Sequence, residues 1–164
     1  MISRMAIWAT RAAAILIATS AAAQTPNKVV GTWRPVSATA EMNGATSLPY
    51  GPDPQGKLIF TSDMHFVELL HDPRIPRFKS IQRGEGTDAE NRAAMAGSVA
   101  LYGRYTIDAD GNFSGNTVEG SSFPNWIGDK RTTEVLTMVV EGDRMTENFQ
   151  RPGGAEVTIV WERI

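Results

Sequence analysis

Short apolar-rich segments alternate with clusters of glycine, proline, asparagine and aspartate along most of the chain. This spacing is typical of a β-sandwich or a β-barrel, because each segment suits a strand and each cluster favours a turn. Asp110-Gly111 is a strong hairpin signal among these turns. The eight predicted strands cover residues 29–39, 57–60, 64–70, 101–107, 112–119, 130–140, 144–149 and 156–163.

The alternation within the first and last strands indicates a sheet with one buried side. In the first strand Val29, Gly31 and Trp33 share a face, because alternate side chains of a strand point the same way. The shared face of the last strand carries Val157, Ile159, Trp161 and Arg163. A closed barrel would bury this side without leaving exposed sheet edges, but periodicity alone leaves both barrel and sandwich open.

A single helix is predicted between the third and fourth predicted strands. Thr87 followed by Glu90 has the spacing of a capping box, in which the two side chains bond the backbone N–H groups of the first turn. The helix is expected to run from residue 88 to about residue 98. Its apolar side chains are mostly alanine and methionine, so we expect it to cover a surface. The segments 41–55 and 71–86 are rich in proline and glycine and are predicted to be loops.

Residues 1–23 have the three regions of a secretory signal peptide. Arg4 and Arg11 provide a positive start, 12–18 is an apolar run, and alanines at 21–23 precede a cleavage site before Gln24. The apolar run is shorter than the ~20 residues that span a bilayer, although a membrane anchor remains the alternative. We therefore expect one domain, residues 24–164, that is periplasmic or secreted and keeps no stable membrane anchor after cleavage.

Charge and motif content exclude several classes of function. Without Arg4 and Arg11 the chain has 14 basic and 18 acidic side chains, a net charge of −4, and no basic cluster for nucleic acid. Cysteine is absent, so no disulfide stabilises the fold. His65 and His71 match no common metal-ligand spacing, and no nucleotide-binding or nucleophile motif is present. We expect neither a metal site nor a cofactor.

Gly31-Thr32-Trp33 on the first strand, with Arg163 at the end of the last strand, resembles the lipocalins and their relatives. A guanidinium over an indole face gives cation–π attraction, and Gly31 permits close approach. The wider pattern is similar to the small bacterial and fungal lipocalin-like domain family. The similar stretches are residues 30–34, 50–60, 74–78, 102–105, 118–128 and 160–163.

This resemblance implies a mostly β fold, an antiparallel eight-stranded lipocalin-like barrel of the calycin type, with one short helix. In it Gly31, Trp33 and Arg163 would close the barrel. The resemblance implies a fold more firmly than a function, because related barrels include both carriers and cyclising or isomerising enzymes.

Four residues are candidates for catalysis, two of them as acid and base. Glu119 precedes an aromatic loop, and a carboxylate facing an apolar cavity would have a raised pKa. His65 shares a face with Val67 and Leu69, and would lie in the lumen if that face points inward. Arg104 and Tyr102 share a side and could stabilise an oxyanion. The alternatives are a rim histidine, a structural Glu119 paired with Arg104, and a solvated Arg104.

The candidate ligand-binding residues are aromatic or close to aromatic side chains. Phe123, Asn125 and Trp126 form a loop that could floor or cover a pocket, or plug the closed end. Tyr105, which faces away from Tyr102, completes the set.

Three functions follow as hypotheses. The first is an exported lipocalin-like protein that binds a small apolar or aromatic molecule in the barrel lumen. The second is a cofactor-independent isomerase, cyclase or lyase, which requires Glu119 and His65 to converge in one cavity. The third is a filled barrel that acts as an envelope interaction module, with no cavity and an exposed apolar patch. The sequence predicts neither the ligand nor the oligomeric state.

Overall fold

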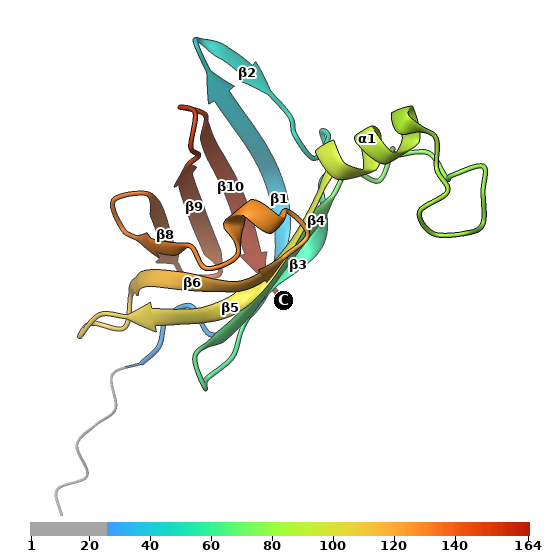
Figure 1. Cartoon of the computed structure of the whole chain (residues 1–164). Coiled ribbons are helices and arrows are strands. Elements are labelled where there is room, and N and C mark those ends of the chain that lie inside the picture. Colours follow the sequence, from blue (N-terminus) through green and yellow to red (C-terminus); the bar gives the residue numbers. More distant parts are fainter. Residues whose placement is uncertain (1–25) are drawn as a thin grey trace, which may run out of the picture.

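The computed structural model describes residues 26–164 (Figure 1), so the predicted signal peptide at 1–23 lies outside the described residues. The strands are β1 (Gly31–Met42), β2 (Ala45–Ser47), β3 (Gln55–Phe60), β4 (His65–His71), β5 (Ser98–Ile107), β6 (Phe113–Ser121), β7 (Lys130–Thr132), β8 (Leu136–Glu141), β9 (Arg144–Gln150) and β10 (Glu156–Arg163). One α-helix, α1 (Asp88–Ala96), and a short 3-10 helix, η1 (Pro124–Trp126), complete the described elements. Neither helix of this part of the chain is long and apolar enough to span a bilayer.

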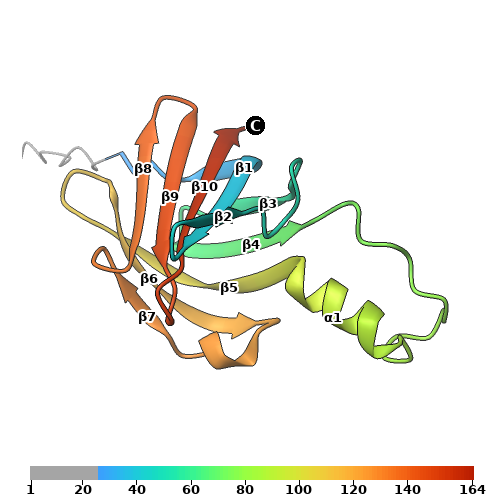
Figure 2. The same cartoon turned by 90° about the horizontal axis from the view of Figure 1, so that it is seen from above.

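The strands form one antiparallel sheet that curls into a nearly closed barrel (Figure 2). Their order is β7-β6-β5-β4-β3-β1-β10-β9-β8, with β2 added to β1. The two ends of this order, β7 and β8, follow each other in the chain, but no ladder pairs them within residues 26–164. The predicted mostly β, antiparallel barrel with one helix is therefore confirmed.

Two strands differ from the prediction. The predicted strand over 130–140 is broken by a turn, in which the Val135 N–H donates to the Thr132 carbonyl, and becomes β7 and β8. The predicted loop 41–55 contains β2, which pairs with the end of β1 across Asn43-Gly44. Both turn residues have positive φ, 52° and 76°, which is the conformation that a two-residue hairpin requires.

The interior of the barrel is filled mainly by large apolar side chains. On β10 the buried residues are Val157, Ile159 and Trp161, which confirms the predicted alternation. On β4 the inward residues are Phe66, Glu68 and Leu70. Because the strand period is two, His65, Val67 and Leu69 point outward.

Residues 28–30 cover one end of the barrel, and their carbonyl groups accept hydrogen bonds from Trp33 and Arg163. The Trp33 indole is fully buried and donates its N–H to the Val29 carbonyl at 2.9 Å. The Arg163 guanidinium lies 4.0 Å from the centre of this ring and donates to the carbonyls of Lys28 and Val30. A Cβ on Gly31 would lie 2.7 Å from Arg163 Nη1, so a larger residue would displace the guanidinium.

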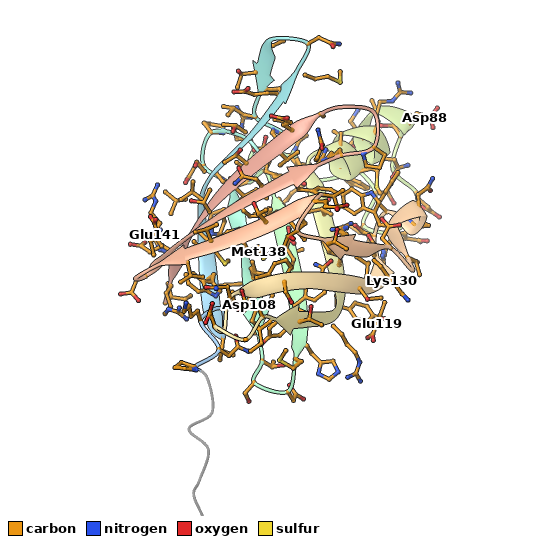
Figure 3. The ribbon with its side chains drawn as sticks, turned by 90° about the vertical axis from the view of Figure 1, so that its left-hand side faces the viewer. Asp88, Asp108, Glu119, Lys130, Met138 and Glu141 are labelled. Carbon is orange, nitrogen blue, oxygen red and sulfur yellow. The ribbon has the colours of Figure 1, made fainter. Side chains whose placement is uncertain are left out.

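The opposite end of the barrel carries α1 and the β1–β2 hairpin (Figure 1). Asp88 lies near the end that carries α1, and Asp108 lies near the other end (Figure 3). The predicted capping box is present, with Thr87 accepting from the Glu90 N–H and Glu90 accepting from the Thr87 N–H. The helix projects from the side of the rim next to β5 (Figure 2), and it contributes little to the core because none of its side chains is fully buried.

Candidate functional site

A pocket of about 650 Å³ opens at the barrel end that carries α1. Its walls come from α1, the start of β5, the loop around η1 and the loop after β9. The side chains that shape it are Tyr50, Met95, Phe123, Asn125, Trp126 and Arg151. The pocket therefore combines aromatic surface with a guanidinium.

The loop between β6 and β7 supplies the aromatic wall because it folds into a short 3-10 turn. Pro124 occupies the first turn of η1, where its missing N–H costs nothing, and the Trp126 N–H donates to the Phe123 carbonyl. The Phe123 and Trp126 rings meet edge to face with centroids 5.3 Å apart. Trp126 also meets Phe149 of β9 at 6.0 Å, which fixes the indole against the barrel wall.

Below this pocket the barrel interior contains a buried polar cluster. Its members are Tyr50, Glu68, Arg131, Glu147 and Arg151. These side chains line a cavity of about 20 Å³, enough for about one water molecule. Tyr50, Trp126 and Arg151 line both this inner cavity and the outer pocket, so the two spaces adjoin.

Arg131 is held mainly by aromatic rings. Its guanidinium carbon lies 4.9 Å from the Trp126 ring centre and 4.5 Å from that of Phe149. Only 7% of the residue is exposed, and its Nε and Nη2 atoms have no hydrogen-bond partner within residues 26–164. Its one charged neighbour in that range within 4 Å is Asp129, at 3.9 Å.

The two buried carboxyl groups have raised pKa values. Burial raises the pKa of Glu147 to about 7, although a hydrogen bond from Trp161 Nε1 at 2.9 Å opposes this shift. Burial, reinforced by the nearby Glu147 carboxylate, raises the pKa of Glu68 well above its ordinary value. Burial also raises the pKa of the Tyr50 hydroxyl to about 12. Near pH 7 the Tyr50 hydroxyl is thus neutral and burial favours the neutral form of Glu68, whereas both arginines carry a positive charge.

Three of the four predicted ligand-binding residues line the outer pocket, namely Phe123, Asn125 and Trp126. Tyr105 does not. It is buried toward the opposite end, where its hydroxyl donates to the Thr61 carbonyl and accepts from Asn27 Nδ2, both at 2.7 Å. Its ring packs edge to face on Phe60, so Tyr105 contributes to the core.

The four candidate catalytic residues lie on the outer face of the barrel. Glu119 points away from the barrel (Figure 3), and its carboxylate accepts a hydrogen bond from Arg104 Nε at 3.2 Å. Tyr102 is exposed and its ring covers Gly120. The expected convergence of Glu119 and His65 in the lumen is therefore not found.

His65 belongs to the outward phase of β4. Its Nδ1 lies 3.3 Å from the Asp63 carboxylate, and its backbone is paired with Arg104 on β5. The neighbouring Val67 and Leu69 are half exposed. The apolar face that His65 shares is thus an outer surface.

No sequence motif pointed to the residues of the buried polar cluster, which are Tyr50, Glu68, Arg131, Glu147 and Arg151. A signal for two of them is present in the strand alternation. Glu68 is in phase with Phe66 and Leu70, and Glu147 with Met145 and Phe149. A carboxyl group within an apolar phase of a strand indicates a buried polar site.

In a comparison with known protein families, residues 30–164 match the family of lipocalin-like domains. None of the curated proteins matches this sequence.

Proposed function

Because the chain belongs to the lipocalin-like domain family, we propose that it binds a small, largely apolar or aromatic molecule at the open end of its barrel. The observation that carries this proposal is the pocket of about 650 Å³ walled by Tyr50, Phe123 and Trp126. Pockets for small molecules commonly have roughly 300–1,000 Å³ and are lined by aromatic side chains with a few polar groups. Both conditions are met here.

The packing in the rest of the barrel supports the same location for the ligand. The end near Trp33 is covered by the N-terminal segment and filled by the rings of Phe60, Tyr105 and Phe113. The inner cavity is small and polar, so an apolar molecule is expected to enter beside Trp126 and remain near the rim.

We also propose that the protein acts in the periplasm or outside the cell. The support is the pattern of residues 1–23, with Arg4 and Arg11 before the apolar run and Ala23 at the cleavage site. Mass measurement of the protein from the periplasmic fraction is expected to give a chain that begins at or near Gln24. A chain retaining residues 1–23 in the membrane fraction would support the anchor alternative instead.

Replacing Trp126 by alanine is expected to weaken ligand retention about tenfold, because an aromatic contact of this kind contributes on the order of 1 kcal/mol beyond its area. Residues 24–164 would be incubated with the small-molecule extract of the producing cells and passed through gel filtration. Mass spectrometry would then identify each compound that elutes with the protein.

The matched control is Tyr102→Ala, which removes an exposed aromatic ring from the outer face. If the Tyr102→Ala variant retains the compound and the Trp126→Ala variant loses it, the pocket is supported as the binding site. Equal retention by both variants would refute it. Absence of any retained or altered compound would favour the filled barrel, whose outer apolar patch includes Val67 and Leu69.

A second candidate function is cofactor-independent isomerisation, cyclisation or elimination. The observation that favours it is the position of Glu147 in the wall of the inner cavity that adjoins the pocket. Burial raises the pKa of this carboxyl group to about 7, so it can donate and accept protons at neutral pH. In the same incubation an enzyme would consume a compound and form a product, and Glu147→Gln would abolish this change. If Glu119→Gln abolished it instead, the acid–base role would belong to the outer face.

A further inference from the structure

We propose that the ligand carries a carboxylate, which Arg151 and Arg131 bind where the outer pocket meets the inner cavity. This inference rests on the proposed function, since it assumes that the outer pocket receives the apolar part of the molecule. It adds the chemical class of the ligand and the two side chains that select it.

The first observation is the unsatisfied hydrogen-bonding capacity of Arg131. A guanidinium has five N–H donors, and buried donors in folded proteins are almost always paired. Arg131 lies in the wall of the inner cavity with Nε and Nη2 unpaired within residues 26–164. The aromatic rings of Trp126 and Phe149 stabilise its charge but accept no conventional hydrogen bond.

The second observation is the position of Arg151. It lines both the outer pocket and the inner cavity, so its guanidinium can be reached from solvent through the pocket. Arg151 Nη2 donates to the Tyr50 hydroxyl at 3.2 Å, which orients the group, while the buried Nε has no partner in the described part of the chain. An incoming acceptor would therefore meet free donors from two arginines.

The two buried carboxyl groups interact with these cations only at longer range. No ion pair of 4 Å or less joins Arg131 or Arg151 to Glu68 or Glu147 within residues 26–164. Glu147 Oε2 already accepts from Trp161, and burial favours the neutral form of Glu68. Asp129 approaches Arg131 only to 3.9 Å and is partly exposed. A bound anion would give the unpaired guanidinium N–H groups a direct hydrogen-bonded partner.

The dimensions favour a carboxylate over a larger anion. The inner cavity has about 20 Å³, which admits one carboxylate oxygen while the rest of the group stays in the outer pocket, whereas a phosphate is tetrahedral and larger. A planar carboxylate also matches the fork of a guanidinium. Trp126 lies between the two spaces, so an aromatic or alkyl body would contact its indole while the carboxylate points inward.

Binding of such a ligand is expected to strengthen as pH falls from 8 to 6. The titratable and charged groups around the site are Tyr50, Glu68, Asp129, Arg131, Glu147 and Arg151. Of these, Glu147 changes charge in this interval, because its pKa is about 7. Its protonation removes a repulsive charge, while a ligand carboxylate with an ordinary pKa remains ionised.

The test compares 2-naphthoate with 2-naphthalenemethanol, a neutral probe of similar shape, by calorimetry on residues 24–164. The wild-type protein is expected to bind the carboxylate at least about tenfold more tightly than the alcohol. Arg151→Met, which keeps most of the apolar stem, is expected to weaken carboxylate binding about ten- to hundredfold. Its affinity for the alcohol should change less than about threefold, within the range of a lost stem contact.

Arg104→Met on the outer face is the control and should leave both affinities unchanged. Arg131→Met should reduce carboxylate binding as Arg151→Met does, and if it fails to fold, Arg151→Met alone decides. Equal binding of both probes by the wild-type protein, or unchanged carboxylate binding by the Arg151→Met variant, would overturn the carboxylate inference while leaving the pocket intact. Failure of both probes to bind would overturn the pocket as well.

Discussion

Replacing Trp33 by alanine is expected to lower the free energy of unfolding by about 3–5 kcal/mol, the cost of removing a large aromatic side chain from a packed core. Trp33 is fully buried. The substitution also removes the indole N–H that bonds the Val29 carbonyl and the ring beneath the Arg163 guanidinium. The end of the barrel that residues 28–30 cover would thus lose its packing and part of its hydrogen bonding.

Urea titration followed by circular dichroism would measure this loss. Trp126→Ala is the matched control, because Trp126 is only partly buried and lies at the opposite end of the barrel. We expect the control to lose clearly less stability than the Trp33→Ala variant. Equal losses in the two variants would contradict the assignment of Trp33 as a core residue that closes the barrel.

The second large effect is a decrease in stability as pH rises from about 5 to 8. Glu147 has a pKa of about 7 in the folded protein and an ordinary value of 4.5 when unfolded. Between these values the folded state binds more protons than the unfolded state, so the free energy of unfolding falls as pH rises. For Glu147 alone the full change is on the order of 3 kcal/mol, and Glu68 acts in the same direction.

Glu147→Gln is expected to flatten this pH dependence. Its side-chain oxygen can still accept the Trp161 indole N–H, but no charge has to be buried at high pH. Urea midpoints at pH 5, 6.5 and 8 would measure the slope, with Glu119→Gln as the exposed control. An unchanged slope in the Glu147→Gln variant would show that Glu147 is not the group that titrates.

At acid pH four carboxyl groups lower the free energy of unfolding as pH falls, which is the opposite dependence. Hydrogen bonds lower the pKa of Asp63, Asp72, Asp108 and Glu90, that of Asp72 to about 2. Their contribution is present above the unfolded pKa and is lost as pH falls through the folded pKa. Stability is therefore expected to be greatest at about pH 4–5, between the two opposing effects.

The features that the sequence predicted correctly depend on neighbouring residues. The capping box of Thr87 and Glu90 involves residues three apart, and each hairpin turn is encoded by its own short segment. The Asn43-Gly44 turn before β2 was also encoded locally, but the prolines later in the same segment concealed it. The break between β7 and β8 has no comparable local signal, because residues 130–140 contain no glycine, proline, asparagine or aspartate to mark a turn.

Which face of a strand points inward could not be read from one strand alone. Alternation identifies the two faces of β4, and the choice between them depends on composition. The charged Glu68 on the buried face indicates a polar face, while Val67 and Leu69 on the outer face indicate an apolar one. His65 was consequently considered for the lumen, although it lies outside.

The candidate site was predictable only where it is continuous in sequence. Phe123, Asn125 and Trp126 belong to one loop and line the pocket together. Arg131 and Arg151 come from β7 and from the loop after β9, and they approach the same indole only when the barrel has formed. A buried cluster of this kind depends on strand register, which a single sequence does not specify.

The pairing of β1 with β10 has a consequence for how the protein is made. The hydrogen bond from Arg163 to the Val30 carbonyl joins residues 133 positions apart. Contacts of such separation have a high loop-closure cost and are typical of slowly folding β proteins. During synthesis β1 and β9 therefore both keep an open edge until the last segment is released. A chain shortened before Glu156 would retain both edges and is expected to aggregate rather than to accumulate as a smaller barrel.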